Sequence, residues 1–247
     1  VYEILFGCAH EVGHFIQALR DIEGYEGIHR LIEERAEKMA QYILSRPDLK
    51  DKIIKDLREQ IKDSESLSEE ELLKKAFEQV YHQFFNAILD VNANEQIIRR
   101  LIPFREGPRS KVPQEIYRRK LFPSQKEGNP PDYTEDPYYS QFTFSLIRDY
   151  MTSENSIVAN EVREVFEREV RIYGEEKTIR EIIKTEIASA ESPFDLKIIS
   201  ERFLLPIFEE LLKKDIEEGR FKIKVIENDL HSEEGKSEIR EGVRRFI

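Results

Sequence analysis

Residues Tyr81 to Glu95, in the middle of the chain, read YHQFFNAILDVNANE. Its polar residues recur at every fourth position among large apolar ones, and residues four apart lie on one face of a helix. We name this row the polar stripe; it consists of His82, Asn86, Asp90 and Asn94. The pattern predicts a core helix with one polar line, and that line is where its chemistry would be found.

Helical patterns extend from this stretch in both directions. Ser68-Glu69-Glu70-Glu71 is a capping-box sequence, because the Ser hydroxyl can cap the backbone while the Glu three residues on reaches back. It predicts a long helix that ends near Leu101. Further helices are expected at 2–19, 28–44, 50–62, about 114–121, 141–151, 156–172, 178–188 and 196–218, with a short strand at 221–226. The predicted fold is mainly α, with little or no sheet.

Two organisational features follow from the same pass along the chain. The apolar residues of the first helix lie nearly all round it, which predicts a helix buried in the core. Residues 103–137 are rich in proline and aromatic residues, so we expect an ordered loop region there. We therefore predict one domain over residues 1–152, which includes this loop region, followed by a helical C-terminal region over 153–247.

The composition excludes several classes of function. The 247 residues carry a net charge of -11, which argues against nucleic acid as the main ligand. A local concentration of Arg and Lys between 99 and 120 is most simply a solvated loop that balances acidic helices. The single Cys8 excludes a disulfide framework and a cysteine-rich metal site, so any metal must use His, Asp or Glu. No apolar run is long enough for a signal peptide or membrane span, and a cytoplasmic location is expected.

The first helix contains His10-Glu11-Val12-Gly13-His14. Residues four apart on a helix can direct two imidazoles at one ion, and Glu11 beside them suits a general base for a water that the metal activates. A carboxylate in so apolar a helix also needs a partner or metal to compensate its burial. The alternative is two hydrogen-bonded core histidines with an exposed Glu. Zn²⁺ is the cofactor that this pattern predicts.

A catalytic zinc site needs a third protein ligand while one position stays open. On the polar stripe, Asp90 is the natural anionic ligand, with Asn86 and Asn94 one turn either side as residues that orient it or a histidine. Glu95 is the alternative third ligand, but it lies further round the helix and outside the stripe. His82 is a further supporting residue. An oxyanion donor is also required, for which His82, Tyr117, Tyr133, Tyr138 and Tyr139 are candidates that spacing cannot separate.

These motifs resemble a known family. His10 to His14 is similar to the active-site helix of the zincin metallopeptidases. The spacing Asn86, Asp90, Asn94 resembles the second motif of metallopeptidases that are often encoded beside, or fused to, von Willebrand A domains. The resemblance covers roughly the first 100 residues and implies His10, His14 and Asp90 as zinc ligands and Glu11 as catalytic base.

The resemblance also has two departures. Zincins generally place a sheet before this helix, whose edge strand holds the substrate, and nine residues precede His10 here, so an incomplete cleft is expected. The metal-ion-dependent adhesion motif of a von Willebrand A domain is absent, so such a domain would be a partner. The leading hypothesis is a zinc peptidase acting on a peptide or protein substrate. The alternative is an inactive metal-binding or regulatory interaction module.

Overall fold

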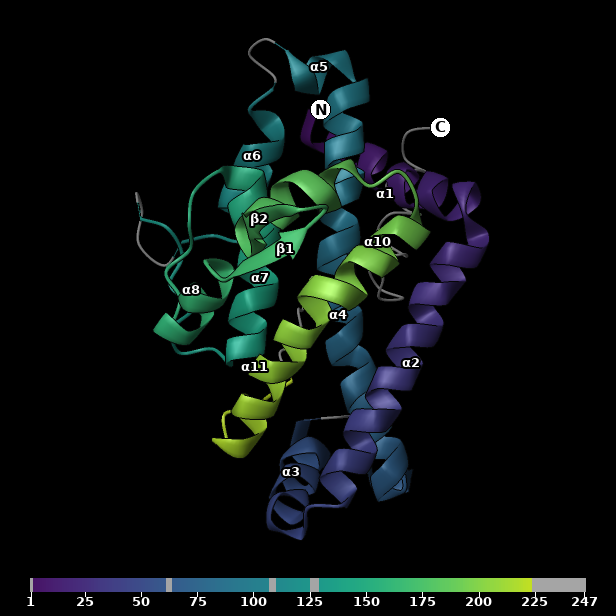
Figure 1. Ribbon diagram of the computed structural model, residues 1–247, viewed down its shortest axis with the longest axis vertical. Coiled ribbons are helices and arrows are strands. Elements are labelled where there is room, and N and C mark those ends of the chain that lie inside the picture. Colours follow the sequence, from purple (N-terminus) through teal and green to yellow (C-terminus); the bar gives the residue numbers. More distant parts are fainter. Residues whose placement is uncertain (1, 61–63, 107–109, 125–128, 224–247) are drawn as a thin grey trace.

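The helix α4, Glu69–Arg100, runs through the middle of the structure, a computed structural model that describes residues 2–60, 64–106, 110–124 and 129–223 (Figure 1). The predicted capping box is confirmed, because the Ser68 hydroxyl accepts from the Glu71 N–H while the Glu71 carboxylate accepts from the Ser68 N–H. Helices α1, α2, α3 and α7 all pack on α4. The central stretch of sequence is therefore the axis about which the other helices assemble.

The fold is mainly helical, as predicted. Three of its helical segments, η2, η3 and η4, are π-helical turns that continue an α-helix. The other elements are α1 (Tyr2–Arg20), α2 (Ile22–Leu44), α3 (Pro47–Gln60), η1 (Ser64–Ser66), α5 (Ile102–Arg105), α6 (Val112–Ile116), η2 (Tyr117–Leu121), α7 (Tyr138–Thr152), α8 (Asn160–Phe166), β1 (Glu169–Ile172), β2 (Glu175–Thr178), α9 (Ile179–Ile182), η3 (Ile183–Ile187), α10 (Pro193–Ile199), η4 (Ser200–Leu204) and α11 (Leu205–Glu217).

The start of α2 differs from the prediction. The sequence predicts a helix from residue 28, but α2 begins at Ile22 and runs through Gly24 and Gly27, and the Asp21 carboxylate caps it by accepting from the Gly24 N–H at 2.9 Å. A Cβ at position 24 would lie 2.5 Å from the backbone nitrogen of Phe194 in α10. The glycine therefore permits close contact between two helices rather than ending one.

The helix predicted over 156–172 is wrong in its second half. Helix α8 ends at Phe166, and β1 then pairs with β2 as an antiparallel hairpin in the register Val170 to Lys177. Tyr173 and Gly174 form its two-residue turn with φ angles of 50° and 89°, which is the left-handed backbone that such hairpins require. The strand predicted over 221–226 does not form at 221–223, where Phe221 packs into the core instead; residues 224–226 lie outside the described residues.

The burial predicted for α1 is also wrong. This helix contacts α4, α2 and α6 along one side only, where Phe6 and Gln17 are buried. Its other side is solvent-exposed and apolar among the described residues. We call this the outer face of α1, and it consists of Ile4, Leu5, Val12, Phe15, Ile16 and Leu19.

The Pro-rich region and the C-terminal helices pack against the rest of the described structure. Within the Pro-rich region, Phe104 packs edge-on to Phe6 with ring centroids 5.4 Å apart, and Tyr117 and Tyr133 are buried. Helix α10 packs on α2 and α11 packs on α7, while the division after residue 152 stays a prediction. Among the described helices, none combines the length and apolarity needed to cross a membrane.

Candidate metal centre

Helix α1 approaches α4 closely at Gly13. A Cβ at this position would lie 3.2 Å from the Ile97 Cδ1 atom and 3.7 Å from the Ala93 Cβ atom, so even an alanine would require the Ile97 side chain to shift by a few tenths of an ångström. Gly13 lies on the inner side of α1 between His10 and His14. The absence of a side chain there lets both imidazoles reach α4.

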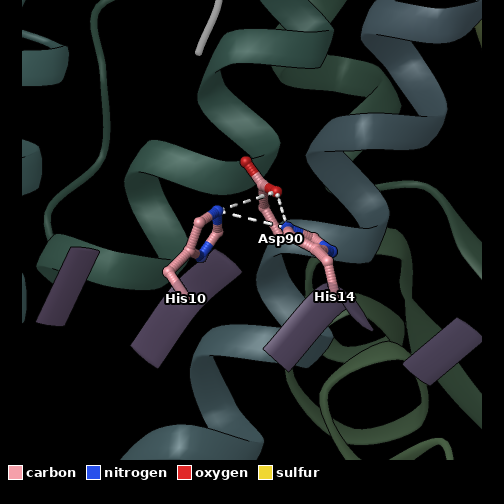
Figure 2. A group of neighbouring side chains, drawn as sticks. All are labelled: His10, His14 and Asp90. Atoms are coloured by element: carbon pink, nitrogen blue, oxygen red, sulfur yellow. Dashed lines mark hydrogen bonds and ion pairs between the residues drawn. The ribbon is translucent and has the colours of Figure 1, made fainter. Parts of the chain in front are cut away.

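Figure 2 shows His10 and His14 of α1 converging on Asp90 of α4. The His14 Nε2 atom lies 2.9 Å from the Asp90 Oδ1 atom, and the His10 Nε2 atom lies 3.5 Å from the same oxygen. The two Nε2 atoms are 3.2 Å apart. One potential ligand atom from each residue thus falls within 4.8 Å of the others. Two imidazoles and one carboxylate on a pair of helices form a donor set that suits zinc.

The other ring nitrogen of each histidine faces an amide oxygen. The His10 Nδ1 atom lies 2.9 Å from the Asn94 Oδ1 atom, and the His14 Nδ1 atom lies 3.1 Å from the Gln17 Oε1 atom. An amide oxygen can only accept a hydrogen bond, so with the amides placed in this way each Nδ1 is suited to donate. A neutral ring with its proton at Nδ1 would leave Nε2 free to bind a metal, which is the ligand form of histidine.

The three converging atoms are close enough for a proton or a cation to lie between them. Burial lowers the pKa of His14, but the hydrogen bond and the negative charge of Asp90 outweigh it, and the pKa is raised above its ordinary value. The side chains of His10, His14 and Asp90 are 12%, 14% and 25% exposed. The cluster is therefore largely desolvated yet open on one side, as a site that admits a ligand must be.

Glu11 has an unusual environment beside this cluster. Its Oε1 atom is buried and makes no hydrogen bond in the described structure, while the carboxylate is close enough to raise the pKa of His14. An unsatisfied buried oxygen costs on the order of 1–3 kcal/mol, so its retention calls for a functional reason. Comparisons of the chain with protein-family models, curated proteins and solved structures found no match.

The competing third ligand is engaged elsewhere. Glu95 accepts from the Tyr150 hydroxyl at 2.5 Å and from the Arg99 Nε atom at 2.6 Å. Within the described structure, the carboxylate that joins the two histidines is that of Asp90. The geometry thus favours the residue on the polar stripe, because the stripe faces α1 at this level of the helix.

The polar stripe does not face α1 along its whole length. The His82 ring lies against His29 of α2, with ring centroids 5.5 Å apart, two turns away from Asp90. Tyr138 and Tyr139 lie at the start of α7, where their backbone N–H groups bond to α11. These residues are not brought to the cluster. Asn86 is half-buried one turn before Asp90, and its orienting role stays a prediction.

Tyr117 lies behind the cluster. Its hydroxyl accepts from the Asn94 Nδ2 atom at 2.7 Å, so Tyr117 holds Asn94 while Asn94 holds His10. Burial, and then the negative charge of Asp90, raise the pKa of Tyr117 well above its ordinary value. The phenol therefore stays neutral and serves this hydrogen-bond chain.

Two residues of the site escaped the sequence analysis. Gln17, three residues after His14 on the inner side of α1, could have been found as a polar residue in an apolar helix. Asn92 carried no such signal, because it lies off the polar stripe and its partners are backbone carbonyls 95–98 residues away. Sequence spacing reveals neighbours on a helix but not contacts with a distant turn.

The basic residues between 99 and 120 are largely paired with carboxylates. Arg99 pairs with Glu95, Arg119 with Glu115 and Lys120 with Glu3. Each pair neutralises a charge that a polyanion would need. This pairing agrees with a solvated region that balances its acidic neighbours.

Proposed function

We propose that this chain is a zinc-dependent peptidase in which His10, His14 and Asp90 hold the metal and Glu11 is the general base. The observation that carries the proposal is the convergence of two imidazole nitrogens and one carboxylate oxygen, with a buried and unpartnered carboxylate oxygen beside them. Structural polar clusters generally satisfy all their members. A hydrolytic site needs a base whose lone pair is left available.

Each residue has a defined task in this reaction. Zinc would supply Lewis acidity that polarises a substrate carbonyl and makes an adjacent water easier to deprotonate. Glu11 accepts the proton of the attacking water and later delivers it to the leaving amine. Gln17 and Asn94 hold the imidazoles in orientation from behind. Gly13 keeps the two helices close enough for α1 and α4 to share one ion.

Metal content tests the ligand set directly. After purification without chelators, plasma mass spectrometry of the parent protein is expected to find about one zinc per chain. His14→Ala and Asp90→Ala each remove a ligand and are expected to lose it. Glu95→Ala is the matched control, because this carboxylate follows Asp90 on the same helix but bonds to Tyr150. A parent without stoichiometric metal would contradict the proposal.

The role of Glu11 is tested by Glu11→Gln. This variant keeps the shape of the side chain but cannot take up a proton, so it should retain zinc while cleavage of an unfolded protein substrate falls by at least about 100-fold. Glu3→Gln is the matched control, because Glu3 lies on the same helix, paired with Lys120 and away from the cluster. Full activity in Glu11→Gln would refute the assignment of the base.

One observation favours a second candidate, an inactive metal-binding module that captures a partner. The outer face of α1 leaves Phe15 64% and Leu19 59% exposed, and exposed apolar patches of this kind mark interaction sites. Binding of a partner chain that survives Glu11→Gln, together with metal but no cleavage, would favour this module over the peptidase.

A further inference from the structure

A chain of hydrogen bonds leads away from His14 and ends in the C-terminal half of the molecule. The Gln17 Oε1 atom faces the His14 Nδ1 atom, and the Gln17 Nε2 atom donates to the Asn92 Oδ1 atom at 2.7 Å. The Asn92 Nδ2 atom lies within hydrogen-bond range of the carbonyl oxygens of Ile187, Ala188 and Ala190, at 3.0, 3.3 and 2.9 Å. Both amide side chains are buried.

The carbonyls at the far end fix the direction of every bond in this chain. They belong to the end of the helix that contains η3, where carbonyls become available to groups outside the helix; that of Ile187 also accepts from the Ala190 N–H at 3.4 Å. A carbonyl can only accept, so the Asn92 amide must turn its NH₂ group toward η3 and its oxygen toward Gln17. Gln17 must then donate to Asn92 and offer its own oxygen to His14. Reversing either amide would set two acceptors or two donors face to face.

Asp90 acts on the same imidazole in the opposite sense. Its Oδ1 atom lies 2.9 Å from the His14 Nε2 atom and would attract the single proton of a neutral ring to Nε2. That tautomer would block the lone pair that a metal requires. It would also leave the Gln17 oxygen facing an unprotonated Nδ1. We call the hydrogen-bond chain from the η3 carbonyls through Asn92 and Gln17 the relay. The relay and Asp90 compete for the single proton of the neutral His14 ring.

We propose that the helix end at Ile187 to Ala190, acting through Asn92 and Gln17, holds His14 as the tautomer protonated at Nδ1 and so keeps Nε2 available to a metal. Gln17 and Asn92 are positioning residues in this account. Their effect on metal binding rests on the proposed function, whereas the tautomer is a property of the protein alone. The relay makes His14 depend on a segment that begins 173 residues further along the sequence, at Ile187.

The corresponding chain behind His10 lacks such an anchor. It ends on the Tyr117 hydroxyl, which can donate as well as accept, so the Asn94 amide can be reversed if the hydroxyl turns. The two histidines of one motif are therefore held differently. Only His14 has its tautomer dictated by groups that cannot change their role.

The tautomer can be read without any metal. Two-bond ¹H–¹⁵N correlation spectra of the full chain in chelator, at a pH where the imidazole is neutral, distinguish a ring protonated at Nδ1 from one protonated at Nε2. The parent is expected to show His14 protonated at Nδ1. In Gln17→Met, which has similar bulk but no acceptor, the proton is expected to move to Nε2 and bond to Asp90. A parent ring protonated at Nε2 would overturn the inference.

Metal affinity gives the second readout, with Co²⁺ as an optical probe. Gln17→Met is expected to bind Co²⁺ about 10–100-fold more weakly than the parent, as loss of a group that orients a metal ligand generally does. Gln17→Glu carries an acceptor oxygen at both ends of its side-chain group, so it can accept the Nδ1 proton without Asn92 to set its direction, and it is expected to bind Co²⁺ close to the parent level. Gln41→Met is the control, because this exposed glutamine of α2 bonds only to the exposed Glu70 among the described residues.

The outcomes separate the two proposals. A parent that binds no Co²⁺ but shows the expected tautomer refutes the metal site and supports the relay. If the parent, Gln17→Met and Gln17→Glu all bind Co²⁺ with the same affinity, the metal site is supported and the role of the relay is refuted. Equal losses in Gln17→Met and Gln17→Glu would indicate a packing role for Gln17, and this result would also overturn the inference.

Discussion

Two carboxylates lie at helix–helix contacts in this protein, and their surroundings are opposite in kind. Asp215 of α11 is fully buried, and its oxygens accept from the Tyr138 and Tyr139 N–H groups at the start of α7, each at 2.9 Å. Asp90 of α4 lies instead against the Nε2 atoms of His14 and His10, at 2.9 and 3.5 Å from its Oδ1 atom. One carboxylate accepts from backbone N–H groups, and the other faces imidazoles that can bind a metal.

The difference distinguishes a structural carboxylate from a functional one. Asp215 caps the helix α7 by accepting from its first two N–H groups, which stabilises the fold whether or not a ligand is present. Asp90 faces two imidazoles that could share a cation with it. The two residues differ in burial, with 25% of the Asp90 side chain exposed and Asp215 fully buried, and also in the kind of atom that surrounds each carboxylate.

The largest expected effect is on stability, and it falls on Asp215. Asp215→Ala leaves two N–H groups of α7 and the nearby Arg220 without their carboxylate, so the free energy of unfolding is expected to fall by about 3–5 kcal/mol. Asp90→Ala removes a carboxylate that is 25% exposed and faces imidazoles rather than helix N–H groups, so the loss without metal should stay below about 1 kcal/mol. Urea denaturation of both variants in chelator at neutral pH measures this. Equal losses in the two variants would contradict the distinction between a structural Asp215 and a functional Asp90.

The next largest effect is the pH dependence of the free energy of unfolding that Asp215 causes. Burial raises the pKa of Asp215 to about 6, from 3.8, although the backbone N–H bonds and Arg220 act in the opposite direction. Because the folded pKa is the higher one, the contribution to stability is complete below about pH 4 and is lost as the pH rises to 6 and above. Relative to Asp215→Asn, the parent should lose about 2–3 kcal/mol between pH 4 and 7.

Denaturation of the parent and Asp215→Asn in chelator at intervals across this range gives the difference directly. Taking the difference removes the contributions of all other groups that titrate equally in both proteins. A difference that does not change with pH would show that donors around Asp215 fully offset its burial. Asp215 would then be a carboxylate whose charge is fully satisfied by the fold, in contrast to Asp90.

Much of the helical architecture could be predicted from the sequence, because it depends on local patterns. The capping box at Ser68 and the spacing of apolar residues set the bounds of α4 within a residue. The hairpin at Tyr173 was missed because its strands are four residues long and highly charged, so they carry no apolar alternation. The start of α2 was predicted too late, because glycine occurs both where helices end and where two helices pack closely, as Gly24 does.

The candidate site divides in the same way. His10, His14 and Asp90 could be found from helical spacing, since each pair of neighbours on a helix has a fixed separation in sequence. The relay through Asn92 could not, because it joins α1, α4 and the end of η3, and these contacts exist only after the chain has folded. Local periodicity predicts which residues share a face, but not which distant backbone atoms that face meets.

The smallest expected effect extends the comparison to the two sides of α1. Phe15 on the outer face is 64% exposed, whereas Phe6 on the inner side is 3% exposed and packs on Phe104. Phe15→Gln exchanges an exposed ring for a good helix former, so the free energy of unfolding should change by less than about 0.5 kcal/mol. Phe6→Ala should cost about 3–5 kcal/mol. Urea denaturation and Co²⁺ titration of both variants measure these effects.

An unchanged Co²⁺ affinity in Phe15→Gln would mean that the outer face takes no part in holding the metal, since the ligands come from the opposite side of the helix. A loss of several kcal/mol in Phe15→Gln would mean that the outer face is covered in solution, and α1 would then be a buried helix. In that case both sides of α1 would contribute to the stability of the fold. The contrast between its polar inner side and its apolar outer face would no longer reflect a division between a site and solvent.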